Sequence, residues 1–217
     1  MKSQQSGFTL VEIAIVLVII GLLLGGILKG QELINSAKVK NLANDFRVIP
    51  TYIYAYQDKF RALPGDDAAA TSHVGTGANN GNGNGTIDGV WNASETSTTI
   101  ESNLFWEHVR LANLAAGSTV PAAGFAPLNA LGGRIGVTSA TTGTGGQALG
   151  GLTGTYMVCS DAIPGKFAKQ LDIAMDDGDT AKGSMRVLPA GTTDPTTPAV
   201  TTANVDDGTN YLVCMAF

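Results

Sequence analysis

The most constraining feature of this sequence is an apolar run from Phe8 to Leu28, 21 residues in which only Thr9 and Glu12 are polar. A helix of this length extends about 31 Å, which matches the ~30 Å hydrocarbon core of a bilayer. A cleaved secretory signal is the alternative, but its apolar region has ~7–15 residues, follows a basic segment and precedes a small-residue cleavage site. Only Lys2 precedes this run, and Lys29-Gly30-Gln31 follows it. The run therefore predicts a membrane-spanning helix.

Charge is distributed unevenly along the chain. Residues 1–61 carry seven basic and four acidic side chains, whereas residues 62–217 carry six basic and fourteen acidic ones. The net charge of -5 leaves no broad basic face for phosphate backbones, so nucleic acid is not an expected partner. Three lysines shortly behind the run outnumber the one before it, which by the positive-inside rule alone would keep the C-terminal part in the cytoplasm. The orientation of the chain in the membrane must therefore be inferred from other residues.

The residues at the start of the apolar run carry a family resemblance. The segment Ser6-Gly7-Phe8-Thr9-Leu10-Val11-Glu12 joins a polar leader to an apolar helix, with one carboxylate at the fifth place after Gly7. It resembles the class III signal of type IV pilins and type II secretion pseudopilins, over residues 6–30. The resemblance implies that a membrane aspartyl peptidase cuts after Gly7, on the cytoplasmic side, and methylates the new amine of Phe8. Residues 1–7 would then be a leader peptide, and the helix would stay as membrane anchor and filament core.

Glu12 is an energetically unfavourable residue in a membrane-spanning helix. A carboxylate near the end of a membrane helix costs up to a few kcal/mol unless it reaches the interface or finds a partner. One interpretation is a side chain that extends to the cytoplasmic headgroups. The resemblance implies instead that Glu12 pairs with the Phe8 amine of a neighbouring subunit during assembly. The partners it implies are identical or related pilin subunits, prepilin peptidase, the inner-membrane assembly machinery and, before assembly, membrane lipid.

Beyond the membrane run, apolar residues spaced alternately three and four apart predict an amphipathic helix that continues to about residue 60. These residues are Val39, Leu42, Phe46, Ile49, Ile53, Tyr56 and Phe60. Pro50 predicts a kink, and Leu63-Pro64-Gly65 ends the helix. We therefore expect a long N-terminal helix over residues 8–61, with residues 8–28 in the membrane, and a head of residues 62–217.

Short runs of β-branched or apolar residues, bounded by turn residues, predict the strands of this head. The predicted strands are Arg134–Thr138, Thr155–Cys159, Ser184–Leu188 and Tyr211–Met215, and the predicted helices are Ile100–Ala116 and Lys166–Met175. Residues 138–151 and 189–204 are low-complexity loops that cannot bury a core of their own. The expected fold is α+β, a long helix packed on a small antiparallel sheet with long loops, which the resemblance to pilins also implies.

The two cysteines, Cys159 and Cys214, both fall in predicted strands. We expect them to form a disulfide, which would close a loop of 56 residues and contribute about 4 kcal/mol in the chain-entropy model. Two buried free thiols are the alternative. Disulfides persist outside the cytoplasm, so this bond would place the head there. The protein is then expected in the inner membrane as a single-pass protein and, after assembly, in an extracellular filament.

A calcium-loop pattern lies in the Gly- and Asn-rich segment of residues 66–99. Side-chain oxygens occur at positions 1, 3, 5 and 9 of a twelve-residue loop, with Gly at position 6. The candidate ligands are Asn80, Asn82, Asn84 and Asp88. Trp91 stands at position 12 in place of a bidentate Glu, and a series of Asn-Gly turns that needs no ion is the alternative. Asp66 or Asp67 would supply charge across the loop. A second acidic cluster consists of Asp172, Asp176, Asp177 and Asp179.

Catalytic patterns are missing from the sequence. Neither His73 nor His108 belongs to a nucleophile, zinc or glycosidase motif, and the Gly/Asn segment has no Walker lysine. We predict a non-enzymatic structural subunit of a type IV pilus-like filament, with no cofactor other than the candidate calcium. The alternatives are a type II secretion pseudopilin and a membrane-anchored adhesive or binding protein whose exposed Thr/Gly loops contact a ligand.

Overall fold

The computed structural model describes Gly7, residues 9–141 and residues 145–217. Phe8 and residues 1–6 of the predicted leader lie outside the described residues. The chain forms two compact units, Met1–Ala37 and Lys38–Phe217, which we call the N-terminal unit and the head. The division falls inside helix α1, Leu10–Phe60, so each half of this helix is described with its own unit.

The N-terminal unit contains the first half of α1. Its large apolar side chains between Leu10 and Leu28 are 46% to 86% exposed. α1 is long and apolar enough to cross a membrane by length and composition. The predicted apolar helix is therefore present, and its side chains are not covered within one copy of the protein.

The second half of α1 supplies one side of the head core. The apolar stripe that the sequence predicts is buried, with Leu42 and Ile53 fully enclosed. The buried residues of α1 are Val39, Leu42, Ala43, Phe46, Ile49, Ile53 and Tyr56. Phe60, the last residue of the predicted stripe, is half-buried, and the helix runs through Pro50 without ending.

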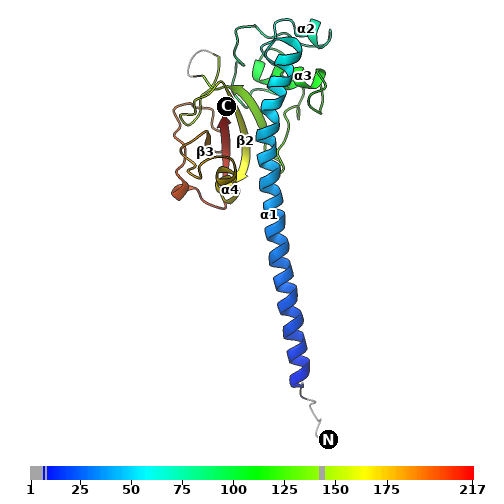
Figure 1. The fold of residues 1–217 in the computed structure, drawn as a ribbon, viewed down its shortest axis with the longest axis vertical. Coiled ribbons are helices and arrows are strands. Elements are labelled where there is room, and N and C mark those ends of the chain that lie inside the picture. The colour runs from blue at the N-terminus through cyan, green and yellow to red at the C-terminus, as the bar shows by residue number, and fades with distance from the viewer. Residues whose placement is uncertain (1–6, 8, 142–144) are drawn as a thin grey trace. The chain divides into compact units, whose positions relative to one another are not determined.

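Four antiparallel strands form one sheet in the order β1-β2-β4-β3 (Figure 1). The strands are β1 Ile135–Ser139, β2 Tyr156–Pro164, β3 Met185–Pro189 and β4 Asn210–Ala216. Each lies where the sequence predicts one, but β2 is longer by five residues at its C-terminal end. There the pairing with β4 shifts register between Ser160 and Ile163, and Ala162 has a φ of 55°. At a bulge the alternation of inward and outward side chains is interrupted, so the sequence pattern did not indicate that the strand continues.

The remaining helical segments are α2 Ala70–His73, α3 Glu101–Leu111, α4 Gly165–Met175 and the short 3-10 helix η1 Thr202–Asn204. The predicted helix that became α3 ends five residues earlier than expected. Asn113 adopts a φ of 60°, and a left-handed residue at this place ends the helix. α4 begins one residue before its predicted start and ends at the predicted Met175.

The sheet separates two apolar clusters. On one face, α1, α3 and α4 pack on side chains such as Val137, Val158 and Val213. On the other face, loop residues cover Cys159, Cys214 and the side chains beside them. The α+β prediction is confirmed. Although the 138–151 loop cannot bury a core of its own, it contributes Ala140, Ala148 and Leu149 to the buried interior.

Candidate functional site

The described part of the predicted processing and assembly segment is held by a capping box at the start of α1. The Thr9 backbone N–H and hydroxyl both donate to Oε2 of Glu12, at 2.8 and 2.7 Å. The Glu12 N–H donates back to the Thr9 hydroxyl oxygen at 3.2 Å. Two N–H groups that a helix start leaves free are satisfied in this way. Glu12 is therefore positioned by Thr9 within a single copy, in contact with solvent.

The contact of Thr9 with Glu12 was not predicted, because Thr9 stands in the sequence as a polar interruption of the apolar run. The spacing Thr-x-x-Glu directly before an apolar helix is the signal that indicates a capping box. Gly7 precedes this box and is exposed. Phe8, the predicted methylated residue, lies outside the described residues.

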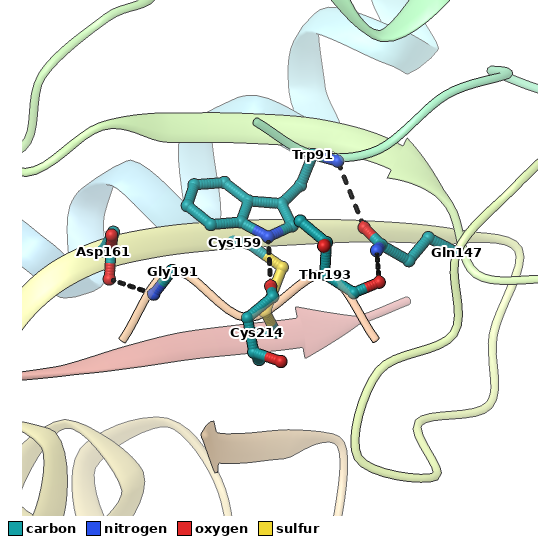
Figure 2. The surroundings of a disulfide bond; sticks show 8 residues. Trp91, Gln147, Cys159, Asp161, Gly191, Thr193 and Cys214 are labelled. Atoms are coloured by element: carbon teal, nitrogen blue, oxygen red, sulfur yellow. Dashed lines mark hydrogen bonds between the residues drawn. A yellow bond between two sulfur atoms is a disulfide. The ribbon is translucent and has the colours of Figure 1, made fainter. Parts of the chain in front are cut away.

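The predicted disulfide is present between Cys159 and Cys214, which are direct neighbours in the pairing of β2 with β4. Both cysteines are fully buried in the second apolar cluster. Figure 2 shows the indole of Trp91 next to the bond, and Trp91 is itself only 2% exposed. The disulfide joins the two central strands under a cover of apolar side chains.

Trp91 and Gln147 also hold the loop that follows β3 over this face. The Trp91 indole N–H donates to the carbonyl of Thr192 at 2.8 Å, and its backbone N–H donates to the side-chain carbonyl of Gln147 at 3.2 Å. The Gln147 amide in turn donates to the carbonyl of Thr193 (Figure 2). Three segments far apart in the sequence are thereby joined above the disulfide.

Buried carboxylates of the head hold the Gly/Asn segment through backbone N–H groups. Asp66 accepts from the N–H groups of Asn84 and Gly85, at 2.9 and 2.7 Å. Glu101, on α3, accepts from those of Asn82 and Asp88, at 2.8 and 3.0 Å. Burial raises the pKa of Glu101, these two donors lower it, and the net pKa is raised. The segment is thus fixed by charged acceptors although it has little regular structure.

His108 and Glu107, also on α3, hold the same segment at Asn79. His108 is fully buried; its Nδ1 accepts from the Gly65 N–H at 2.9 Å, and its Nε2 lies 2.7 Å from the carbonyl of Asn79. This arrangement suits a neutral ring with the proton on Nε2, and burial lowers the pKa of His108. Glu107 accepts from the backbone and side-chain N–H groups of Asn79, and burial raises the pKa of Glu107.

The other histidine belongs to a second polar group. His73 Nδ1 lies 2.7 Å from Oδ2 of Asp67, which also accepts from the hydroxyl of Tyr56 at 2.7 Å. Burial raises the pKa of Asp67, but its hydrogen bonds with His73 and Tyr56 outweigh this effect, so the pKa is lowered. The group connects α1 with α2, a structural role for residues that carried no motif in the sequence.

The four candidate calcium ligands are only partly brought together. Asn82 and Asn84 each donate a side-chain N–H to Oδ2 of Asp88, at 2.9 and 3.0 Å. Their own side-chain oxygens accept from the backbone N–H groups of residues 84 and 86. Asn80 instead accepts from the N–H of Thr71 at 3.0 Å. To bind a calcium ion, these side-chain oxygens would have to give up their hydrogen bonds with backbone N–H groups. The observed contacts are those of a series of Asn-Gly turns, and calcium at this loop stays a prediction.

Within residues 7, 9–141 and 145–217, no three histidine, cysteine or acidic side chains form a group able to hold a metal ion. Asp66, Glu101 and Glu107 instead accept backbone N–H groups of the Gly/Asn segment, which is an arrangement that fixes a loop.

Comparison with known proteins bears on the N-terminal segment. Residues 2–28 match the family model described as the prokaryotic N-terminal methylation motif. The match includes Gly7, Phe8 and Glu12 and ends where the apolar run ends. No curated protein and no solved structure matches the chain.

Proposed function

We propose that this chain, whose N-terminal methylation motif is typical of type IV pilins and pseudopilins, is a structural subunit of a type IV pilus-like filament. The observation that carries the proposal is the match of residues 2–28 to that motif, together with an apolar helix directly behind it. Pilin-like proteins of this kind are typically non-enzymatic. A pseudopilin of a type II secretion system is the nearest alternative, since it would share the same signal.

Processing comes first in this proposal. Prepilin peptidase removes residues 1–7 by cutting between Gly7 and Phe8 and methylates the amine of Phe8. Since the cut precedes the apolar run, the mature protein keeps the whole membrane helix. Support comes from the place of the motif: Gly7 lies two residues before Thr9, the first residue of the capping box that begins α1.

Assembly then uses Glu12. In one copy its carboxylate accepts hydrogen bonds from Thr9, and no cationic side chain among the described residues pairs with it. When residues 8–28 pack among copies of the same helix, that charge leaves water, and the methylated amine of a neighbouring Phe8 neutralises it. An ion pair of this kind is worth most where water is excluded, because the effective dielectric constant is low there. The pair of Glu12 with the neighbouring amine thus fixes the register in which the helices of two copies pack.

The location follows from the same elements. The apolar helix with its prepilin signal suggests anchoring in the inner membrane before assembly, in contact with lipid. The buried Cys159–Cys214 disulfide supports a head outside the cytoplasm, since such bonds form and persist in oxidising compartments. After extraction from the membrane the subunit belongs to an extracellular filament.

Substitution of Glu12 tests this function, with Glu32 as the matched control. Glu32 also lies in the N-terminal unit, but its carboxylate forms an exposed ion pair with Lys29 at 2.7 Å behind the apolar run. We expect Glu12→Ala to lower the fraction of subunit in sheared filaments at least tenfold while the membrane fraction persists. Glu32→Ala should assemble like the unmodified protein. Equal filament yield from Glu12→Ala and the unmodified protein would contradict the assembly role.

A further inference from the structure

The Gly/Asn segment contains a chemically reactive dipeptide three times in succession. The three Asn-Gly pairs of the chain are Asn80-Gly81, Asn82-Gly83 and Asn84-Gly85. In such a pair the main-chain nitrogen of glycine can lose its proton to hydroxide and attack the side-chain carbonyl carbon of asparagine, because glycine has no side chain that hinders the approach. The new N–C bond closes a succinimide ring as the bond to the side-chain nitrogen breaks and ammonia leaves. Water then opens the ring to aspartate or isoaspartate.

The head holds the glycine nitrogen of each pair through a hydrogen bond to a distant residue. The N–H of Gly81 donates to the carbonyl of Asp67 at 2.9 Å. The N–H of Gly83 donates to the carbonyl of Asp66, also at 2.9 Å. The N–H of Gly85 donates instead to a side chain, the carboxylate Oδ2 of Asp66, at 2.7 Å. Because a bonded N–H must be released before its nitrogen attacks, each contact slows ring closure.

The first and last pairs differ in the space around their glycines. A Cβ atom at Gly81 would collide with main-chain atoms of Gly65 and Asp66, so the backbone is closely packed there. At Gly85 no described atom beyond the chain neighbours lies within 4 Å of the corresponding position. Both Asn84 and Gly85 are exposed. The Asn84-Gly85 pair therefore has room for the change of shape that ring closure requires.

The side chain of Asn84 is also the most strongly polarised of the three. Its Oδ1 accepts from the N–H and from the hydroxyl of Thr86, at 2.9 and 2.7 Å. Donors at a carbonyl oxygen stabilise the negative charge that this oxygen gains during attack on its carbon. Within the described residues, the oxygens of Asn80 and Asn82 accept from a single N–H each, at 3.0 and 2.9 Å.

We propose that Asn84 is the site of spontaneous deamidation in the folded protein, and that Asp66 controls its rate. The nitrogen of Gly85 attacks only after it loses its proton, and the negative charge of a carboxylate 2.7 Å away disfavours that loss. Asp66 therefore slows the reaction both as a hydrogen-bond acceptor and as a charge. Its side chain can rotate away from Gly85, whereas the main-chain carbonyls that hold Gly81 and Gly83 move only with the backbone.

Deamidation changes the contacts of the segment. The side-chain N–H of Asn84 donates to Oδ2 of Asp88 at 3.0 Å in the unmodified chain. The product has a carboxylate in place of this donor, so two negative charges face each other and the turn loosens. The reaction depends on the head alone and proceeds whether or not the chain assembles into filaments.

The test follows the full-length protein in detergent at mildly alkaline pH over time. Digestion at acid pH, which suppresses further reaction, and fragmentation by mass spectrometry locate the product among the three asparagines. In the folded protein we expect product at Asn84 well before Asn80 or Asn82. After reduction and unfolding in denaturant, the three positions should react at similar rates, because the contacts that distinguish them are lost.

Substitution of Asp66 tests the control of the rate. Asp66→Ala should accelerate deamidation of Asn84 about tenfold, since it removes a charged acceptor from the N–H of Gly85. Glu107→Ala is the matched control, because Glu107 is also a buried carboxylate that holds this segment, but at the N–H of Asn79. It should leave the rate at Asn84 unchanged.

Tryptophan fluorescence shows whether each variant is folded, because Trp91 and Trp106, the two tryptophans of the chain, are both buried in the head. If Asp66→Ala does not fold, Asp66→Asn replaces it and should accelerate the reaction by at least about threefold, through loss of the charge. The proposal is overturned if another asparagine of the segment reacts first in the folded protein, or if none reacts there. It is also overturned if the folded Asp66 variant keeps the original rate, or if Glu107→Ala accelerates the reaction equally.

Discussion

The two halves of α1 use apolar residues in opposite ways. In residues 10–28 apolar side chains surround the helix, and Leu10, for example, is 86% exposed. In residues 38–60 they form one stripe, and Leu42 is fully buried against the head core. The second half is an amphipathic helix whose apolar stripe is covered by the head of the same chain. The apolar side chains of the first half can be covered only by lipid or by further copies of the helix. One helix therefore contains a folding element and an association element.

Because only the second half of α1 packs in the head core, we expect the stability of the head to be independent of the first half. The largest expected effect is the loss of its disulfide. Replacing both Cys159 and Cys214 by Ala should lower the free energy of unfolding by about 4 kcal/mol, because the unfolded chain regains freedom between residues 55 apart. Membrane insertion, which uses residues 8–28, should not change. Chemical denaturation followed by tryptophan fluorescence measures the first effect, and membrane fractionation the second.

Thiol labelling without reductant provides the control for this prediction. The unmodified protein should resist alkylation, since both sulfurs are bonded and buried. Two alkylated thiols per folded head would show that the disulfide is absent and would remove its support for a head outside the cytoplasm.

A matched pair of substitutions within α1 tests the comparison itself. Ile53 is fully buried and Ile20 is 46% exposed, so the same change meets two environments on one helix. Ile53→Ala should destabilise the head by about 3 kcal/mol, through lost burial and the cavity left behind. Ile20→Ala should leave the head transition unchanged. A similar loss from both variants would show that the two halves fold as one unit.

His108 gives a smaller, pH-dependent effect confined to the head. Its pKa is lowered by burial from 6.5, so the unfolded state binds a proton more readily than the folded state. Head stability from this residue is therefore complete above pH 6.5 and lost as the pH falls below it, with a slope of at most ~1.4 kcal/mol per pH unit. Asp172 changes stability in the opposite direction, since its pKa is raised.

The two contributions are separated by subtracting the pH profile of His108→Gln from that of the unmodified protein. The difference should rise between pH 5 and pH 7. A flat difference would mean that His108 is not held neutral by the N–H of Gly65.

The parts of this molecule that were predictable have a repeating or local signal. The stripe from Val39 to Tyr56 follows helical periodicity, and the four strands follow short apolar runs between turns. Cys159 and Cys214 could be paired because they are the two cysteines of the chain. The position of Glu12 could be read from its motif.

What escaped prediction depends on contacts between distant residues. Glu101 holds the N–H groups of Asn82 and Asp88 across a long stretch of sequence, and no local pattern shows which carboxylate meets which loop. The same is true of Trp91, which lies beside a disulfide formed far along the chain. For Asp172 the sequence showed an acidic cluster, but only the fold shows that this carboxylate is enclosed without a partner.

If the exposed apolar half of α1 is a processed assembly segment, the mass of the assembled subunit must show it. Filaments sheared from cells are purified, and their subunit is measured by intact-mass spectrometry with sequencing of the N-terminal peptide. We expect a chain that begins at Phe8, carries one added methyl group on its amine and retains residues 8–28. A filament-borne chain that still contains Met1 to Gly7, or one that begins beyond Leu28, would contradict it.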